Sequence, residues 1–200
     1  MAQRKIGLLG GSFNPVHQAH IRLALTAFEQ LQLDEVQLIP AGQPWQKKPL
    51  SVSNQDRLTM LQLAIRDYPV LQINTMELER TGPSYTIDTV SQLSRQNGEQ
   101  YYWIMGSDQI NNFCTWRQWQ EIIDYVQLVV ATRPQHTINP PEELRIALQQ
   151  KGQQLLFIDM KEMDLSSTQI RQSILEGDHP LQDLHPDVLH YIQQHHLYLD

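Results

Sequence analysis

The segment Ile6–His20 reads IGLLGGSFNPVHQAH, and its pattern decides the fold. Ile6–Leu9 is a short apolar run, typical of a strand that is buried on both faces. The glycine pair that follows lacks side chains, so the backbone can bend sharply or approach another group closely. A helical pattern then begins near Val16 or His17. Strand, glycine turn and helix in this order predict the first unit of an α/β fold.

The rest of the chain repeats this alternation of short apolar runs and helical patterns. Further strands are predicted at Val36–Ile39, Val70–Ile73, Tyr101–Met105, Leu128–Ala131 and Leu155–Ile158. Between them, apolar residues recur at helical spacing on faces that begin with Ile21, Leu58, Ile87 and Leu144. The alternation predicts a Rossmann-like, doubly wound α/β fold, with a mostly parallel sheet, helices on both faces and a helical C-terminal end. Because ligands of such sheets bind at the carboxyl ends of the strands, the segments after the strands are candidate sites.

Composition limits the classes of partner. A chain of 200 residues with 40% hydrophobic content is expected to form a single domain over residues 1–200. Its net charge of −7 argues against a nucleic-acid or anionic-membrane surface, although a few basic groups can still bind a small anion. Cys114 is the only cysteine, and we find neither a signal peptide nor a membrane-spanning apolar run. We therefore expect a cytoplasmic protein, whose oligomeric state the sequence leaves open.

Two histidines near the start of the first helix suggest phosphate chemistry. His17 and His20 are three residues apart, so they are neighbours on one helical face. The N–H groups and positive dipole end of the helix point to the same space. An adjacent triphosphate would favour the protonated imidazoles. Alternatively, the pair lies on a solvated face or supplies two of three zinc ligands, although a second cysteine and an H-E-x-x-H pattern are missing. The loop also lacks the Walker lysine pattern and the G-x-G-x-x-G fingerprint.

A second candidate phosphate motif follows the last predicted strand, at Leu165–Arg171, LSSTQIR. Its first serine and its glutamine stand at capping-box spacing, so a helix is predicted to start here. The first turn would present N–H groups together with the hydroxyls of Ser167 and Thr168. Arg171 lies over the same face and can donate two parallel hydrogen bonds to phosphate oxygens. On the residues alone, a capped surface helix with a solvated arginine is the alternative.

Together the two motifs resemble the signatures of the nucleotidyltransferase superfamily, and Ile6 to about Tyr198 is similar to bacterial nicotinate-nucleotide adenylyltransferases. The resemblance implies that His17, His20 and Arg171 are catalytic and stabilise charge during transfer at the α-phosphorus of ATP. The ATP site that it implies consists of Gly10, Gly11, Ser12, Phe13, His17, His20, Gly106, Asp108, Arg133, Ser167, Thr168 and Arg171. Asn14 and Ala19 depart from the Asp and Gly that are usual in these motifs.

The stretch Gly82–Thr89, GPSYTIDT, resembles the segment of the same family that binds the pyridine nucleotide. There, backbone N–H groups near the Tyr–Thr pair recognise the nicotinate carboxylate, and a tryptophan stacks on the ring. The implied site consists of Asn14, Lys47, Ser84, Tyr85, Thr86 and Trp116. Gln46 and Arg117 replace residues that are common in the family. Without the resemblance, the stretch is an ordinary turn before a helix, Asp108 a helix start, Lys47 a solvated lysine and Trp116 a packing residue.

The resemblance implies a reaction and its substrates. AMP would pass from ATP to nicotinate mononucleotide, which gives deamido-NAD and pyrophosphate in NAD biosynthesis. Mg²⁺ would bind with ATP, held mainly by substrate oxygens and water, so we name no metal ligand in the protein. Such a transfer needs positioning and charge stabilisation rather than a protein nucleophile. Three alternatives remain open: an enzyme that prefers nicotinamide mononucleotide or a different acceptor altogether, a non-catalytic nucleotide-binding or sensing protein, and a metal-binding protein.

Overall fold

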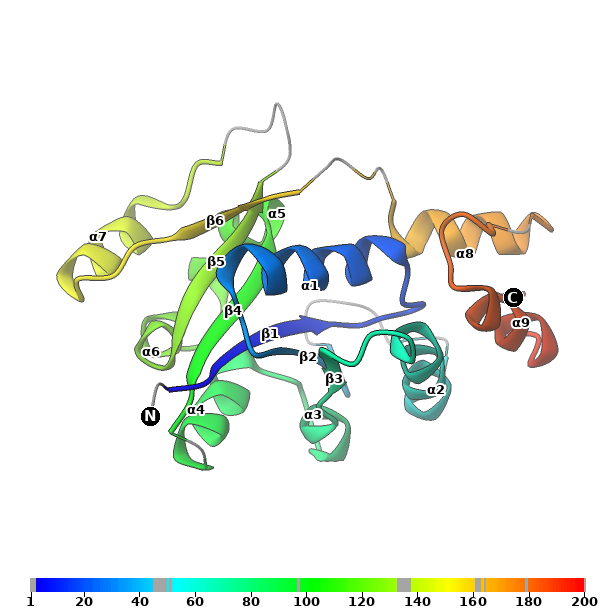
Figure 1. The fold of residues 1–200 in the computed structure, drawn as a ribbon, viewed down its shortest axis with the longest axis horizontal. Helices are drawn as coiled ribbons and strands as arrows, with labels where there is room; N and C mark the ends of the chain where they lie inside the picture. The colour runs from blue at the N-terminus through cyan, green and yellow to red at the C-terminus, as the bar shows by residue number, and fades with distance from the viewer. Residues whose placement is uncertain are drawn as a thin grey trace.

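The structure is a computed structural model, and it describes residues 3–44, 50, 52–96, 98–132, 138–160, 163, 165–178 and 180–199. Its centre is a six-stranded sheet with the order β3-β2-β1-β4-β5-β6 (Figure 1). The strands are β1 (Lys5–Gly11), β2 (Glu35–Pro40), β3 (Leu71–Ile73), β4 (Gln100–Gly106), β5 (Val126–Thr132) and β6 (Leu156–Asp159). Each of the predicted strands is confirmed within one or two residues at either end.

All neighbouring strands in the sheet are parallel, so the predicted fold class is confirmed. The chain runs from β1 to β2 and β3 on one side, and then returns to place β4 on the other side of β1. This reversal puts the topological switch point between β1 and β4. The carboxyl ends of these two strands are therefore the expected place for a ligand.

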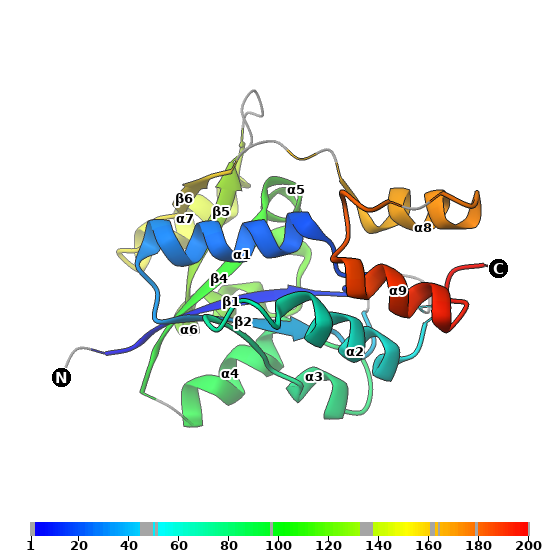
Figure 2. The ribbon, with the colours of Figure 1, turned by 45° about the vertical axis from the view of Figure 1, so that its right-hand side comes forward.

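Helices cover both faces of the sheet (Figures 1 and 2). They are α1 (Gln18–Leu31), α2 (Asn54–Ile65), α3 (Met76–Glu79), α4 (Thr86–Gln96), α5 (Ser107–Asn111), the 3-10 turn η1 (Phe113–Thr115), α6 (Trp119–Tyr125), α7 (Glu142–Gln150), α8 (Ser167–Leu175) and α9 (Pro186–Gln194). One hydrophobic core contains residues of α1, α2, α8 and α9, and the other contains residues of α4 to α7. Residues of β4 alternate between the two cores, with Trp103 in one and Tyr102 and Ile104 in the other. Burial on both sides explains why the strand segments are apolar at successive positions.

The helix starts agree with the capping residues expected from the sequence. Ser53 caps α2, and its Oγ accepts a hydrogen bond from the backbone N–H of Asp56 at 3.1 Å. Ser166 caps α8 in the same way, with the backbone N–H of Gln169 at 3.3 Å. These bonds satisfy N–H groups that have no acceptor inside the helix. They fix where each helix begins, and hence which residues of α8 face the end of β1.

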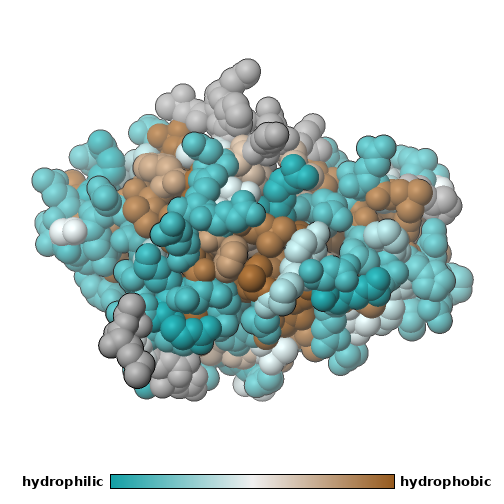
Figure 3. All heavy atoms as spheres, viewed as in Figure 1, coloured by the Kyte–Doolittle hydropathy of each residue, from teal (hydrophilic) through white to brown (hydrophobic). Residues whose placement is uncertain are grey.

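Hydrophilic side chains cover most of the face seen in Figure 3, with hydrophobic side chains gathered in its middle and over α8. Among the large apolar residues, Leu175 and Leu181 are well exposed in the C-terminal part. Within the described ranges, no helix combines the length and the apolar character needed to cross a membrane.

Gly42, in the turn after β2, gives a test of the packing beside β2. A Cβ atom there would lie 2.3 Å from the carbonyl oxygen of Glu77, so the backbone would have to move. We expect Gly42→Ala to lower the free energy of unfolding by about 1–3 kcal/mol, as overpacking does. Equilibrium urea unfolding measures this. The control is Gly98→Ala, where a Cβ meets no atom within 4 Å; equal losses in the two variants would contradict the described packing.

Candidate active site

The residues Ser12–His17, here called the histidine loop, connect β1 to α1 at the switch point. Phe13 is buried and has a left-handed backbone with φ of 43°, which turns the chain away from the strand direction. His17 is the N-cap of α1. Its backbone N–H donates a hydrogen bond to Nδ1 of His20 at 3.2 Å, and the two imidazole rings lie 3.7 Å apart. The predicted pair is therefore assembled at the start of α1.

Burial makes His17 a weaker base than an ordinary histidine. Its side chain is 6% exposed, and within the described part of the chain its Nδ1 has no hydrogen-bond partner. Loss of water around the ring lowers the pKa of His17 to about 4. At neutral pH the ring is therefore neutral in the free protein. A bound anion would favour its protonated form, because an opposite charge stabilises the cation.

The two predicted phosphate motifs meet in the structure, although they lie more than 150 residues apart in the chain. Ser167 Oγ donates to the carbonyl oxygen of Pro15 at 3.0 Å. Arg171 donates to the carbonyl oxygen of Asn14 at 2.8 Å and to the hydroxyl of Thr168 at 3.3 Å. Side chains of α8 thus hold the histidine loop. Because an arginine has five N–H donors, Arg171 can also donate hydrogen bonds to further partners.

Arg57 is a site residue that the sequence analysis missed. It lies in α2 with no exposed surface, and it donates to the carbonyl oxygens of Ser12 and Ala41, each at 2.6 Å, and to the side chain of Asn54 at 2.7 Å. Burial lowers the pKa of its guanidinium. Arg57 therefore fastens the ends of β1 and β2 to α2. Its position, four residues before the buried Leu61, was the available signal, since such a residue shares the inward helical face.

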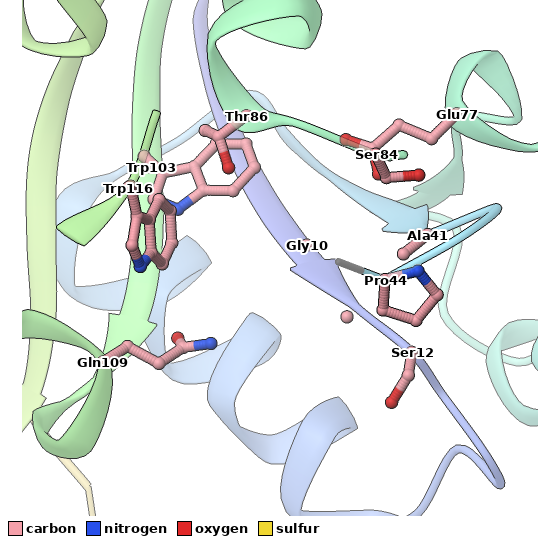
Figure 4. Close-up of a pocket in the computed structure, with 11 residues that line it drawn as sticks. Gly10, Ser12, Ala41, Pro44, Glu77, Ser84, Thr86, Trp103, Gln109 and Trp116 are labelled. Carbon is pink, nitrogen blue, oxygen red and sulfur yellow. The ribbon is translucent and has the colours of Figure 1, made fainter. Parts of the chain in front are cut away.

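A pocket opens at the carboxyl ends of β1 and β4 (Figure 4). Its walls come from the end of β1 and the residue after it, from the segment after β2, from α3, from the start of α4 and the residues before it, from β4 and from the residues that follow β4. The lining residues are Gly10, Gly11, Ser12, Ala41, Pro44, Glu77, Ser84, Thr86, Trp103, Gln109 and Trp116. Six of them belong to the predicted sites, namely Gly10, Gly11, Ser12, Ser84, Thr86 and Trp116. The pocket therefore joins the predicted ATP segment to the predicted pyridine segment.

Ser84 ties the predicted pyridine segment to the turn after β2. Its backbone N–H donates to the carbonyl oxygen of Gln43 at 2.9 Å, and its Oγ accepts from the N–H groups of Gly42 at 3.0 Å and Gln43 at 3.3 Å. Thr86 then begins α4 at the pocket wall, and the N–H groups of Asp88 and Thr89 donate to the carbonyl oxygen of Tyr85 at 3.2 and 3.4 Å. Tyr85 lies outside the pocket lining, with the guanidinium of Arg117 at 4.8 Å from its ring centre.

Glu77 is a buried acid in the pocket wall that the sequence did not reveal. Its side chain accepts a hydrogen bond from the Thr89 hydroxyl at 2.6 Å. Burial raises the pKa of the Glu77 carboxyl, and the bond from Thr89 partly offsets this. Figure 4 shows its carboxyl group beside Ser84. The side chain therefore helps to fix the segment that leads into α4.

Aromatic side chains form another wall of the pocket. Trp116 packs edge-on against Trp103, with ring centres 6.3 Å apart, and lies 5.2 Å from the ring of Phe113. Figure 4 shows the two tryptophans side by side at one boundary of the opening. Because the ring of Trp116 is only partly buried, part of it remains available to a planar ligand.

The remaining predicted residues lie in three different settings. Gly106 is the N-cap of α5, and Asp108 stands exposed in its first turn, at the carboxyl end of β4. Lys47 and Arg133, together with Gln46, lie outside the described residues. Asn14 is buried, and its side chain accepts a hydrogen bond from Tyr198. In the described ranges we find no group of three or more His, Cys, Asp or Glu side chains that could hold a metal ion.

Comparison with known sequences identifies close relatives. Residues 8–173 match the model of the family described as cytidylyltransferase-like. The chain is 50% identical over 198 residues to a Bordetella pertussis protein named "Probable nicotinate-nucleotide adenylyltransferase", covering 99% of this chain and all of the relative. It is 39% identical over 201 residues to a Synechococcus protein of the same name, with 99% and 96% coverage.

Comparison with solved structures identifies the same fold. The nicotinic acid mononucleotide adenylyltransferase of Plasmodium falciparum, solved in complexes with APC and with NaAD, superposes with a TM-score of 0.76. The alignment covers 98% of this chain and 97% of that one at 17% sequence identity. At this identity the likeness concerns the fold.

The buried His17 predicts a pH dependence of stability. Because its folded pKa of about 4 lies below the ordinary 6.5, the folded state favours the neutral ring. The contribution of the neutral His17 ring to the free energy of unfolding is fully present above pH 6.5. It is lost as the pH falls toward 4, by about 3 kcal/mol at most. We expect His17→Gln to lose less stability than wild type between pH 7 and pH 4 in urea unfolding. His190→Gln, at an exposed position of α9, should follow wild type; parallel curves for all three would contradict the buried neutral ring.

Proposed function

Since the chain belongs to the cytidylyltransferase-like family and, within it, to the nicotinate-nucleotide adenylyltransferases, we propose that it transfers AMP from ATP to nicotinate mononucleotide. The products are nicotinate adenine dinucleotide and pyrophosphate, and the reaction is a step of NAD biosynthesis. The observation that carries the proposal is the meeting of the histidine loop with Ser167 and Arg171 beside a pocket walled by Thr86 and Trp116.

The reaction is an in-line displacement at phosphorus. An oxygen of the acceptor's 5′-phosphate attacks the α-phosphorus of ATP and forms the new P–O bond, while the bond to the bridging oxygen breaks and pyrophosphate leaves with the electron pair. This chemistry depends on alignment and on stabilisation of negative charge. A protein nucleophile is not required.

The ATP side of the site uses the two phosphate motifs. His17 and His20 donate hydrogen bonds to phosphate oxygens, and the approach of the triphosphate raises the low pKa that burial gives to His17. Arg171, Ser167 and Thr168 approach from α8, and the exposed Asp108 accepts hydrogen bonds from nucleotide hydroxyls. ATP enters as its Mg²⁺ complex. The cation would be held mainly by triphosphate oxygens and water, and it would supply positive charge that neutralises the phosphates.

The acceptor side uses the start of α4 and the aromatic wall. In the first turn of α4, the N–H groups of Thr86 and Ile87 come before the first helical hydrogen bonds, which Asp88 and Thr89 donate to Tyr85, so these two N–H groups suit a carboxylate. Thr86 presents this turn to the pocket, and Trp116 offers a face to the pyridine ring. The acid is therefore preferred over the amide. We also propose that the protein acts in the cytoplasm, where its substrates are expected.

A substrate comparison tests the assignment. We expect pyrophosphate release with ATP and Mg²⁺, and a kcat/KM for nicotinate mononucleotide above that for nicotinamide mononucleotide. A lost hydrogen bond to a charged group is worth about 1.5–3 kcal/mol, which corresponds to roughly 10- to 100-fold. Equal values would retain the enzyme class but remove the carboxylate site at Thr86. Release with neither substrate would contradict the proposed reaction.

The histidine loop gives a second test. We expect His20→Ala to lower kcat by roughly 100- to 1,000-fold, the usual cost of removing a donor that stabilises charge in the transition state. Circular dichroism and the melting temperature check that the fold is retained. His190→Ala, at an exposed position on α9, serves as the control with unchanged kcat. A His20→Ala enzyme with near-native kcat would exclude this role.

A further inference from the structure

The carbonyl oxygens of the histidine loop are held by side chains from outside the loop. Arg57 of α2 donates to the carbonyl oxygen of Ser12, Arg171 of α8 to that of Asn14, and Ser167 to that of Pro15. A loop between a strand and a helix has no regular backbone partners, so such bonds decide its shape. They come from helices far from the loop in sequence.

A further bond comes from the C-terminal end of the chain. The hydroxyl of Tyr198 donates to Oδ1 of Asn14 at 2.7 Å. The tyrosine is 8% exposed and the asparagine 5%. Water therefore cannot easily replace the bond, and losing it would leave a buried amide oxygen without that donor. Asn14 lies three residues before His17, so this bond acts close to the proposed catalytic histidines.

The backbone before Tyr198 is bent to bring the ring to this place. His196 has φ of 53° and Tyr198 has φ of 66°, both in the left-handed region that is costly for residues other than glycine. Such conformations persist where the surrounding contacts hold them. The strain at the end of the chain is therefore offset by the burial and hydrogen bonding of Tyr198.

The rest of the C-terminal segment is anchored to α2. Helix α9 lies beside α2 at the end of the sheet where β1 leads into the histidine loop (Figures 1 and 2). The hydroxyl of Tyr191 donates to the carboxylate of Asp56 at 2.9 Å, and Asp187 pairs with Arg66. These contacts support α9 itself, whereas Tyr198 reaches the loop.

We propose that Tyr198 is a positioning residue of the adenylyl-transfer site, which holds the histidine loop through Asn14 so that His17 and His20 keep their alignment. The proposal rests on the proposed function. In that function Ser167 and Arg171 bind phosphates as well as the loop. The buried hydroxyl of Tyr198 instead holds the loop through its bond to Asn14. The C-terminal segment therefore contributes to turnover without touching substrate.

The test compares two tyrosines of the C-terminal segment. We expect Tyr198→Phe to lower kcat by about tenfold, because a small misplacement of catalytic groups is costly, while KM for ATP changes by less than about twofold. Tyr191→Phe removes an equivalent hydroxyl that does not reach the loop, and it should keep kcat even where it lowers the melting temperature. A Tyr198→Phe enzyme whose kcat matches that of Tyr191→Phe would overturn the proposal.

A double-mutant cycle with Asn14→Ala identifies the partner. If the hydroxyl acts through Asn14, the kcat of the double variant equals that of the more affected single variant; multiplied effects would overturn the assigned route. Hydrogen–deuterium exchange of residues 12–17 adds a readout independent of turnover, with faster exchange expected in Tyr198→Phe but not in Tyr191→Phe. If the wild type is inactive but exchange follows this pattern, only the proposed function is contradicted. If exchange of residues 12–17 is unchanged in Tyr198→Phe, the positioning role is overturned.

Discussion

The site depends on one constraint, namely that the carbonyl oxygens between β1 and α1 need hydrogen-bond donors. Arg57 meets the need at Ser12 and, through Ala41, ties the segment after β2 to the same point. Ser167 and Arg171 meet it from α8. The histidine loop is therefore contacted by elements from both halves of the sheet. Its shape, and with it the alignment of the two histidines, follows from bonds between distant parts of the chain.

The fold and most of the local structure could be predicted from the sequence, because they depend on short-range patterns. Successive apolar residues in Tyr101–Met105 indicated a strand buried on both faces, and the structure divides them between two cores. The spacing of Ser166 and Gln169 located the start of α8. The motif residues Gly10 and Thr86 indeed line one pocket. The single domain and the roles of the predicted site residues, Lys47 and Arg133 among them, stay predictions.

What the sequence could not show depends on long-range contacts. The spacing of Arg57 to Leu61 could have placed it on the inward face of α2, but its acceptors, the carbonyl oxygens of Ser12 and Ala41, reach it only when α2 packs against the ends of β1 and β2. Glu77 becomes a buried wall residue only when the turn after β2 meets α3 and α4. Tyr198 reaches Asn14 because the chain reverses after α9. The residues that contact Arg57, Glu77 and Tyr198 stand at no fixed spacing from them in the sequence, so no motif predicts these contacts.

The proposed reaction requires that the acceptor phosphate attacks the α-phosphorus of ATP in this site. The most direct measurement uses nicotinate mononucleotide labelled with ¹⁸O in its 5′-phosphate and follows the label by mass spectrometry. If the acceptor phosphate is the nucleophile, the dinucleotide carries every labelled oxygen, including the new bridging one, and pyrophosphate carries none. Label in the phosphate products released from ATP, or AMP formed without dinucleotide, would contradict it.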